Sequence, residues 1–187
     1  KRNNARKILE MAARRVDLAA EINLDEDIRA PAVARPRGDQ ILLTGATGFL
    51  GAFVLRELLA VEQGPISCLV RAPGPAQGAA RIQANLEQYG LWEPAFRDRI
   101  HPVIGDLAKP LLGLGMDEFR KLATSLRVIH HSGAAVNLLF PYVAVKATNV
   151  GGIRELLRLT AVGGGVPLHS VSTAGMFFTR GYARREV

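Results

Sequence analysis

The chain has 187 residues, and its 24 Lys and Arg against 17 Asp and Glu give a formal net charge of +7. Apolar residues make up 48% of it and charged residues 22%, a globular mixture that excludes disordered, collagen-like and coiled-coil chains. No apolar run approaches the ~20 residues of a membrane-spanning helix, the first residues lack a secretory signal, and Cys68 is the single cysteine, so we expect a cytoplasmic protein with no membrane partner and no internal disulfide.

The first 38 residues predict a helical linker. Within residues 1–30, apolar side chains recur near helical spacing with charges between them, which indicates an amphipathic helix that needs a partner surface. These side chains are Ile8, Met11, Ala12, Val16, Ala19 and Ile22. Residues 31–39 are rich in proline and predict a connector. We therefore divide the chain into a linker, residues 1–38, and a domain, residues 39–187.

From residue 40 onward, short apolar runs alternate with stretches of helical period. The runs predict five strands, at residues 41–44, 66–70, 100–104, 127–131 and 166–171. The stretches between them predict helices over residues 49–61, 76–89, 116–122 and 142–162. Strands that alternate with helices and are apolar on both sides predict an α/β fold, a Rossmann-type doubly wound parallel sheet covered by helices on both faces.

A glycine-rich loop between the first strand and the first helix carries the strongest functional signal. Its sequence, TGATGFLG, has the spacing G-x-x-G-x-x-G, in which Gly45 permits a tight turn, Gly48 lets a pyrophosphate approach and Gly51 lets the helix pack closely. The helix N-terminus adds free N–H groups and the positive end of its dipole. Although a plain glycine-rich turn is the simpler alternative, we predict a dinucleotide site. Its contacts come from Thr44, Gly45, Thr47, Gly48, Phe49, Leu50 and Gly51.

The residue after the second strand indicates which nucleotide binds. An acidic residue about 20 positions past the glycines would hold the ribose 2′-hydroxyl of NAD. Here the twentieth position after Gly51 is Arg71, whose guanidinium suits a 2′-phosphate. Arg81, at the following helix, is a candidate second partner. The sequence therefore predicts NADPH as the cofactor, the alternative being that both arginines are solvated surface residues.

The next two strand ends supply further candidate cofactor contacts. Asp106, with Leu107, follows the third strand, where its carboxylate would accept from the adenine amino group or cap the next turn. Small residues follow the fourth strand and leave room for a flat ligand, namely Ser132, Gly133 and Ala134.

Other chemistries find little support in the sequence. The adjacent His130 and His131 would face opposite sides of a strand, and no other spacing predicts a metal site. Ser172 does not lie in the G-x-S-x-G of a hydrolase, and Cys68 is predicted to be a buried apolar residue. Basic residues are scattered and aromatic residues amount to 6%, which argues against a nucleic-acid partner. Nothing in the sequence indicates the oligomeric state.

Together these stretches resemble the extended short-chain dehydrogenase/reductases. More narrowly, they resemble the thioester reductase domains of nonribosomal peptide synthetases, polyketide synthases and carboxylic acid reductases. The stretches are ILLTGATGFLG, CLVRA, GDLAKPLLGL, HHSGAAVNLLFPY, KATNVGGIRELLRL and HSVSTAG. The opening DLAAEINLDEDI is similar to the segment that joins such a domain to its carrier protein.

The resemblance implies a reaction and its participants. An acyl or peptidyl thioester on the phosphopantetheine arm of an upstream carrier domain would be reduced with NADPH to an aldehyde, which some members reduce again to an alcohol. In the family a Ser or Thr and a Tyr donate to the carbonyl oxygen. The Ser or Thr corresponds to Thr173, with Ser172 as the alternative. Asn149 matches the family's Asn in the NVxG helix as a cofactor-site residue, or has a packing role.

The sequence departs from the family pattern at its end. After Thr173 no Tyr-x-x-x-Lys pair is present, since Tyr182 is followed at the fourth place by Glu186 and lies too soon after Thr173. The family continues with more sheet and a smaller substrate-binding lobe. We therefore expect residues 39–187 to be a truncated NADP-binding domain that binds NADPH but is inactive alone. The missing Tyr and Lys would supply general acid catalysis, which typically raises the reaction rate by a factor of ~10²–10⁴.

Two other functions remain open at this stage. One is a different extended reductase or epimerase that acts on a free acyl-CoA or nucleotide sugar. The other is a non-catalytic NADP-binding regulator with the same fold. A carrier domain upstream would favour the thioester reductase, and a downstream Tyr-x-x-x-Lys would exclude the regulator.

Overall fold

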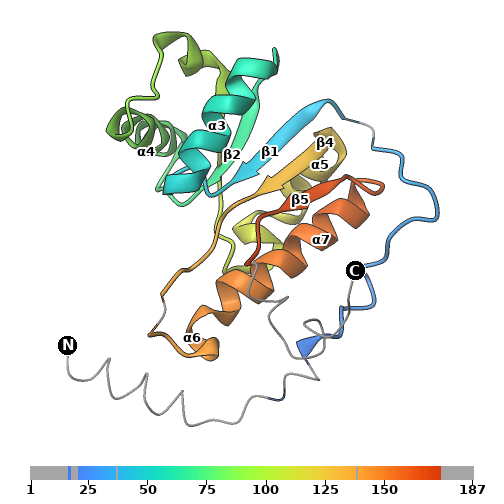
Figure 1. The fold of residues 1–187 in the computed structure, drawn as a ribbon. Coiled ribbons are helices and arrows are strands. Elements are labelled where there is room, and N and C mark those ends of the chain that lie inside the picture. The colour runs from blue at the N-terminus through green and yellow to red at the C-terminus, as the bar shows by residue number, and fades with distance from the viewer. Residues whose placement is uncertain (1–16, 18–20, 37, 138, 174–187) are drawn as a thin grey trace, which may run out of the picture.

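A computed structural model describes residues 17, 21–36, 38–137 and 139–173. In this part of the chain five parallel strands form one sheet, in the order β3-β2-β1-β4-β5 (Figure 1). They are β1 Gln40–Thr44, β2 Ile66–Val70, β3 Ile100–Ile104, β4 Leu126–His131 and β5 Leu168–Ser170. The strand order reverses between β1 and β4, which is the point where open α/β sheets bind ligands. The predicted fold class is confirmed.

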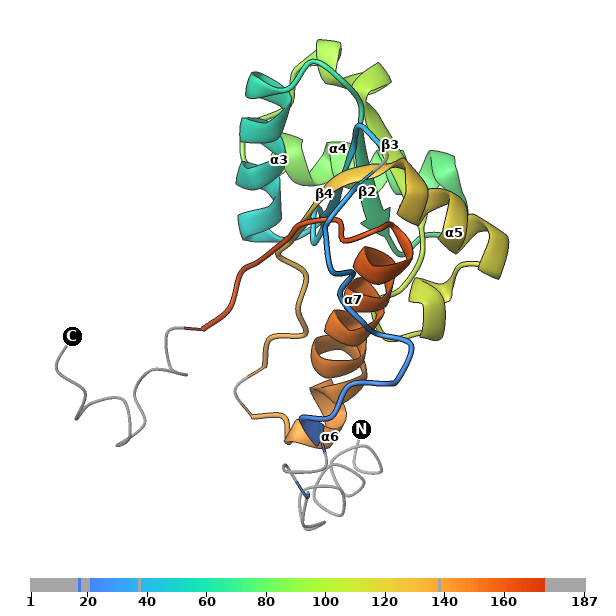
Figure 2. The ribbon, with the colours of Figure 1, turned by 90° about the vertical axis from the view of Figure 1, so that its right-hand side faces the viewer.

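Helices cover both faces of the sheet (Figures 1 and 2). They are α3 Phe49–Val61, α4 Pro75–Gln88, α5 Met116–Ser125, α6 Tyr142–Lys146 and α7 Gly152–Val162. Short 3-10 turns span Pro94–Arg99 and Pro110–Gly113, and a π turn spans Ala147–Gly151. None of the helices in the described residues is long and apolar enough to cross a membrane.

The alternation of side chains along β1 divides the interior into two cores. Leu43 points to the face covered by α3 and α4, where it packs with Leu55 and Ile82. Leu42 points to the other face, where it packs with residues of α5 and α7. Because both faces are buried, the central strands are apolar at nearly every position, as the sequence analysis predicted.

The structure interrupts the helix predicted over residues 142–162. Residues Ala147–Gly151 form a π turn between α6 and α7, and the Asn149 side chain in this turn bonds to the backbone of Ala135. A π turn inserts an extra residue into the helical ladder, and such insertions often mark functional positions. The predicted strand over residues 166–171 is also shorter, since β5 begins after Pro167, which has no N–H for the ladder.

The segment before β1 lies along α6 and α7. Most of the predicted amphipathic helix falls on residues 1–16 and 18–20, outside the described residues. Residues 23–36 form turns and extended stretches, so helical structure does not continue to residue 30. We call residues 21–36 the N-terminal strap, which Figure 2 shows in blue beside α7. Its two ends are held by Glu21, which pairs with Lys146, and by Arg35, whose N–H donates to the carbonyl of Gly164.

Candidate nucleotide-binding site

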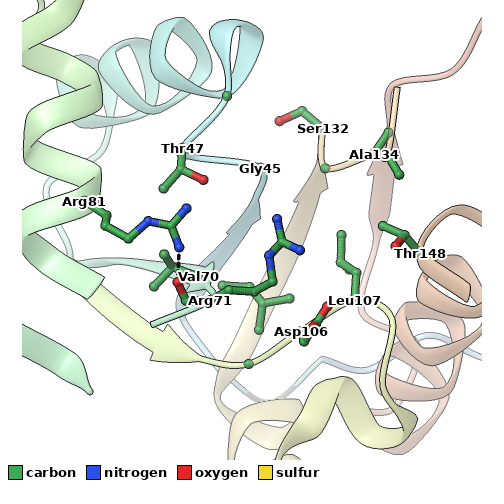
Figure 3. A pocket seen from close by; sticks show the side chains of 15 residues that line it. Gly45, Thr47, Val70, Arg71, Arg81, Asp106, Leu107, Ser132, Ala134 and Thr148 are labelled. Carbon is green, nitrogen blue, oxygen red and sulfur yellow. Dashed lines mark hydrogen bonds between the residues drawn. The ribbon is translucent and has the colours of Figure 1, made fainter. Parts of the chain in front are cut away.

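A cavity of about 320 Å³ opens at the carboxyl edge of the sheet, where the strand order reverses (Figure 3). Its walls come from the glycine loop, the ends of β2, β3 and β4, α4 and the π turn. The lining residues are Gly45, Thr47, Gly48, Leu69, Val70, Arg71, Arg81, Gly105, Asp106, Leu107, Ser132, Gly133, Ala134, Ala135 and Thr148. The cavity therefore brings together ten of the candidate residues that the sequence analysis drew from five separate stretches.

The glycine loop has a shape that side chains would prevent. Gly45 has a φ of +84°, and a Cβ there would lie 2.7 Å from the backbone nitrogen of Gly133. A Cβ at Gly51 would lie 1.9 Å from the carbonyl oxygen of Gly45, because the first turn of α3 packs directly against the turn out of β1. Gly48 precedes α3 without a side-chain cap. The backbone of the loop is therefore open to a ligand at the helix N-terminus.

Two arginines face the cavity from neighbouring elements. Arg71 directly follows β2, and Arg81 lies on α4. Both side chains are exposed; that of Arg81 extends into the cavity beside Thr47, and that of Arg71 extends into its middle (Figure 3). The Arg81 guanidinium donates to the carbonyl oxygen of Arg71. This bond fixes the two residues relative to each other and leaves other guanidinium donors for an anion.

The end of β3 contributes a carboxylate. Asp106 lines the cavity, and its Oδ1 accepts from the backbone N–H of Ala108 at 3.0 Å, so it also caps the following turn. Leu107 lines the cavity beside it and packs against Gly152 at the start of α7, where a Cβ would lie 3.1 Å from Leu107.

Thr44 holds the loop after β4 in place and does not line the cavity. Its buried hydroxyl lies 2.6 Å from Nδ1 of His131, and the backbone N–H of Gly133 donates to its oxygen. The Ser132 hydroxyl donates to the carbonyl oxygen of Thr44 at 2.9 Å. Burial lowers the pKa of His131 below its ordinary value, so the imidazole is neutral at neutral pH.

Two neighbouring residues of the π turn, Thr148 and Asn149, have different roles at the cavity. Asn149 accepts from the N–H of Ala135 at 2.8 Å and donates to its carbonyl at 3.0 Å, which fixes the loop beside the cavity. Thr148, which the sequence analysis missed, lines the cavity itself. Its place directly before the Asn of NVGG was the one sequence feature near it, and that feature does not by itself predict a cavity wall.

Five further candidates do not line the cavity, and one of them is Gly51, which packs against the turn out of β1. The Phe49 and Leu50 side chains are exposed on the first turn of α3 and form no part of the cavity wall. Ser172 and Thr173 follow β5 at the same edge of the sheet but lie outside the lining. Tyr182, which the sequence analysis considered and set aside, lies outside the described residues.

The histidines and the cysteine have structural surroundings. His130 stacks on His169 with ring centroids 5.2 Å apart, whereas His131 turns to the opposite side toward Thr44. Across the described residues, no three His, Cys, Asp or Glu side chains gather as a metal site would need. Cys68 is fully buried, as predicted, and burial raises the pKa of its thiol to about 12.

Known proteins share this sequence and fold. Residues 43–186 match the NAD-binding family described as male sterility protein. The chain is 52% identical to one subunit of the linear gramicidin synthase of Brevibacillus parabrevis over 136 residues, which are 73% of this chain and 3% of that protein. It is 43% identical to the glycine betaine reductase ATRR of Emericella nidulans, over 85% of this chain and 13% of that protein.

A solved structure gives the same relationship. The crystal structure of the terminal R domain from the myxalamid PKS-NRPS biosynthetic pathway is 46% identical and superposes with a TM-score of 0.81, over 84% of this chain and 41% of that one. The chain thus spans less than half the length of each of these relatives. With the glycine loop and its cavity, these matches show that the chain belongs to the male sterility family of NAD-binding domains, among the reductase domains of nonribosomal peptide and polyketide synthases.

Proposed function

We propose that this chain is the cofactor-binding part of an NADPH-dependent reductase that releases a carrier-bound acyl or peptidyl thioester as an aldehyde. The observation that carries the proposal is the cavity, where an open glycine loop at a helix N-terminus lies within the same walls as Arg71 and Arg81. Such a loop suits a diphosphate, and paired guanidinium groups suit the extra phosphate that distinguishes NADP from NAD.

Different residues of the chain would bind different parts of the cofactor and the substrate. The loop from Gly45 to Gly48 and the first turn of α3 would bind the diphosphate, and Arg71 with Arg81 would bind the 2′-phosphate. The bound cofactor would supply hydride for the thioester carbonyl carbon. Charge then grows on the carbonyl oxygen, so a donor aimed at that atom is needed. We assign this donor to Thr173, with Ser172 as the alternative, because both follow β5 at the carboxyl edge of the sheet, the edge at which the cavity opens.

The proposed partner is an upstream carrier domain. Glu21 pairs with Lys146 at 2.6 Å, and Lys146 lies two residues before Thr148, which lines the cavity. The strap therefore begins, at Glu21, near the edge of the sheet that holds the cavity. A thioester arm of a carrier domain upstream of the strap would approach this edge without crossing the sheet.

The test of the cofactor is a titration of the purified chain with NADPH and with NADH. Arg71→Ala should weaken NADPH binding about tenfold or more, because a hydrogen bond to a charged group contributes ~1.5–3 kcal/mol. NADH binding should hardly change. Arg97→Ala, which removes an exposed arginine before β3 at the opposite edge of the sheet, is the matched control for net charge. An equal loss for both cofactors would contradict the 2′-phosphate assignment, and a wild-type chain that binds neither would contradict the proposed function.

A further inference from the structure

Asn85 on α4 makes contacts that none of the comparisons or sequence motifs explains. It is half-buried beside Leu86, on the border of the helix face that packs into the core. Its Nδ2 donates to the carbonyl oxygen of Ala46 at 3.0 Å and to that of Gly48 at 3.1 Å. A single side chain thus bonds to two carbonyls of the glycine loop, across more than 35 positions of sequence.

These two bonds determine where the loop points its N–H groups. In a trans peptide the carbonyl of one residue and the N–H of the next point in opposite directions. When Asn85 holds the carbonyls of Ala46 and Gly48, the N–H groups of Thr47 and Phe49 point away from Asn85. The N–H of Gly48 is already bonded to the carbonyl of Gly45 at 2.9 Å, so the N–H groups of Thr47 and Phe49 are the ones this bracing orients.

The start of α3 shows which way these groups face. The carbonyl of Gly48 also accepts from the N–H of Ala52 at 3.1 Å, as the first bond of the helix, so it points along the axis into α3. The N–H of Phe49 therefore points out of the helix N-terminus. Donors at that position bind anions. Tyr89, one turn after Asn85, braces the same corner because its ring lies 5.5 Å from that of Phe49.

We infer that Asn85 is a positioning residue for the diphosphate of the dinucleotide, acting through the carbonyls of Ala46 and Gly48. This inference rests on the proposed cofactor site and divides it into two separable parts. Asn85 serves the diphosphate, which all nicotinamide dinucleotides share, and Arg71 serves the 2′-phosphate. Loss of Asn85 therefore weakens NADPH and NADH alike, whereas loss of Arg71 weakens NADPH alone.

Two fragment ligands separate the two parts by calorimetric titration of the purified chain. ADP-ribose has the diphosphate without a 2′-phosphate, and 2′-AMP has the 2′-phosphate without a diphosphate. Asn85→Ala should weaken ADP-ribose about tenfold, because the unbraced loop must then be ordered on binding, and leave 2′-AMP unchanged. Arg71→Ala should do the reverse. Gln83→Ala is the matched control, since Gln83 lies on the same helix and donates to the exposed Glu87.

If Asn85 had a purely structural role, its loss would weaken ADP-ribose and 2′-AMP alike, and a second variant tests this. Asn85→Asp keeps the size of the side chain but removes the two donors at neutral pH. It should therefore weaken ADP-ribose at least as much as Asn85→Ala does, with the apo protein still folded by circular dichroism. Wild-type affinity in Asn85→Asp, or an equal loss of ADP-ribose and 2′-AMP in Asn85→Ala, would overturn the inference. A wild-type chain that binds neither fragment would instead count against the proposed cofactor site.

Discussion

The buried pair of Thr44 and His131 joins the two central strands at the mouth of the cavity. Both side chains are almost completely inaccessible, and Oγ1 and Nδ1 lie 2.6 Å apart. An imidazolium at this place would have to be desolvated, and burial accordingly lowers the pKa of His131. The neutral ring is therefore part of the folded structure, and the bond to Thr44 satisfies one of its nitrogens.

This pair makes the stability of the domain depend on pH. The pKa of His131 lies below 6.5 in the folded state, so the unfolded state binds more protons as the pH falls through 6.5. The free energy of unfolding should therefore decrease between pH 7.5 and pH 5, and His131→Gln should make that decrease smaller. Urea denaturation of the wild type and of His131→Gln at several pH values measures the free energy of unfolding and its dependence on pH.

His101 supplies the control for this measurement. It is exposed on β3, so His101→Gln should leave the pH dependence as it is in the wild type. Burial also lowers the pKa of His130, so part of the pH dependence should persist in His131→Gln. Identical slopes for the wild type and His131→Gln would contradict the role of His131.

Some residues of the site could be predicted from sequence, and the reason is geometric. Gly45, Arg71 and Asp106 each directly follow a strand or lie one residue beyond it, and the carboxyl ends of parallel strands meet at one edge of the sheet. Asn85 and Thr148 could not be predicted in this way. Each lies within a helical stretch, and no spacing pattern records a side chain that reaches a distant loop or a cavity wall.

At the scale of elements, charge holds the N-terminal strap on α7. Arg158, whose side chain is 15% exposed, pairs with Asp25 at 2.5 Å and with Asp27 at 2.6 Å, and also with Glu155. Arg154 donates to the carbonyls of Glu21 and Asn23. Three of the four larger apolar side chains of the strap, Ile22, Leu24 and Val33, are exposed, and the fourth, Ile28, is half-buried. Ion pairs and backbone bonds therefore fix this segment, with little contribution from apolar burial.

Arg158→Met should release the strap while the sheet stays folded. The substitution keeps part of the apolar stem but leaves three carboxylates close together without their common cation. Amide hydrogen exchange in residues 21–36 should become faster, with little change in β1 and β4. Arg127→Met, which breaks the more exposed pair with Glu62, is the control. Unchanged exchange in the strap of Arg158→Met would show that other contacts hold it.

The strap and the π turn also show where periodicity fails as a predictor of elements. The first four strands and α3 were predicted almost residue by residue, because short buried runs and a helix with one apolar face leave strong patterns. Over residues 142–162 the apolar residues keep helical spacing through the π turn. The sequence therefore gives no signal for the bond between Asn149 and Ala135 that accompanies this turn. The strap is likewise bonded at Asp25 and Asp27 to Arg158, a residue more than 120 positions away that no local period records.

At the scale of the whole domain, the cavity lies between the two halves of the sheet. Arg71 and Arg81 belong to the half formed by β2, β3 and α4, and the loop after β4, together with Thr148, belongs to the half formed by β4, β5 and α7. A dinucleotide that contacts both walls binds only when both halves are folded. Its binding free energy should therefore stabilise the domain as one unit.

Thermal unfolding with two probes tests this coupling. NADPH at 100 times its dissociation constant should add about 2.7 kcal/mol to the unfolding free energy, which corresponds to a rise in Tm of roughly 5–10 °C for a chain of this size. Trp92, the single tryptophan, packs against the core under α3 and α4, whereas far-ultraviolet circular dichroism follows all helices and strands. Both signals should shift by the same amount, because ligand binding and unfolding involve the whole domain. In Arg71→Ala at the same NADPH concentration both shifts should shrink together. A shift of the Trp92 fluorescence without the matching change in circular dichroism would mean that the half containing α7 unfolds independently of the cofactor.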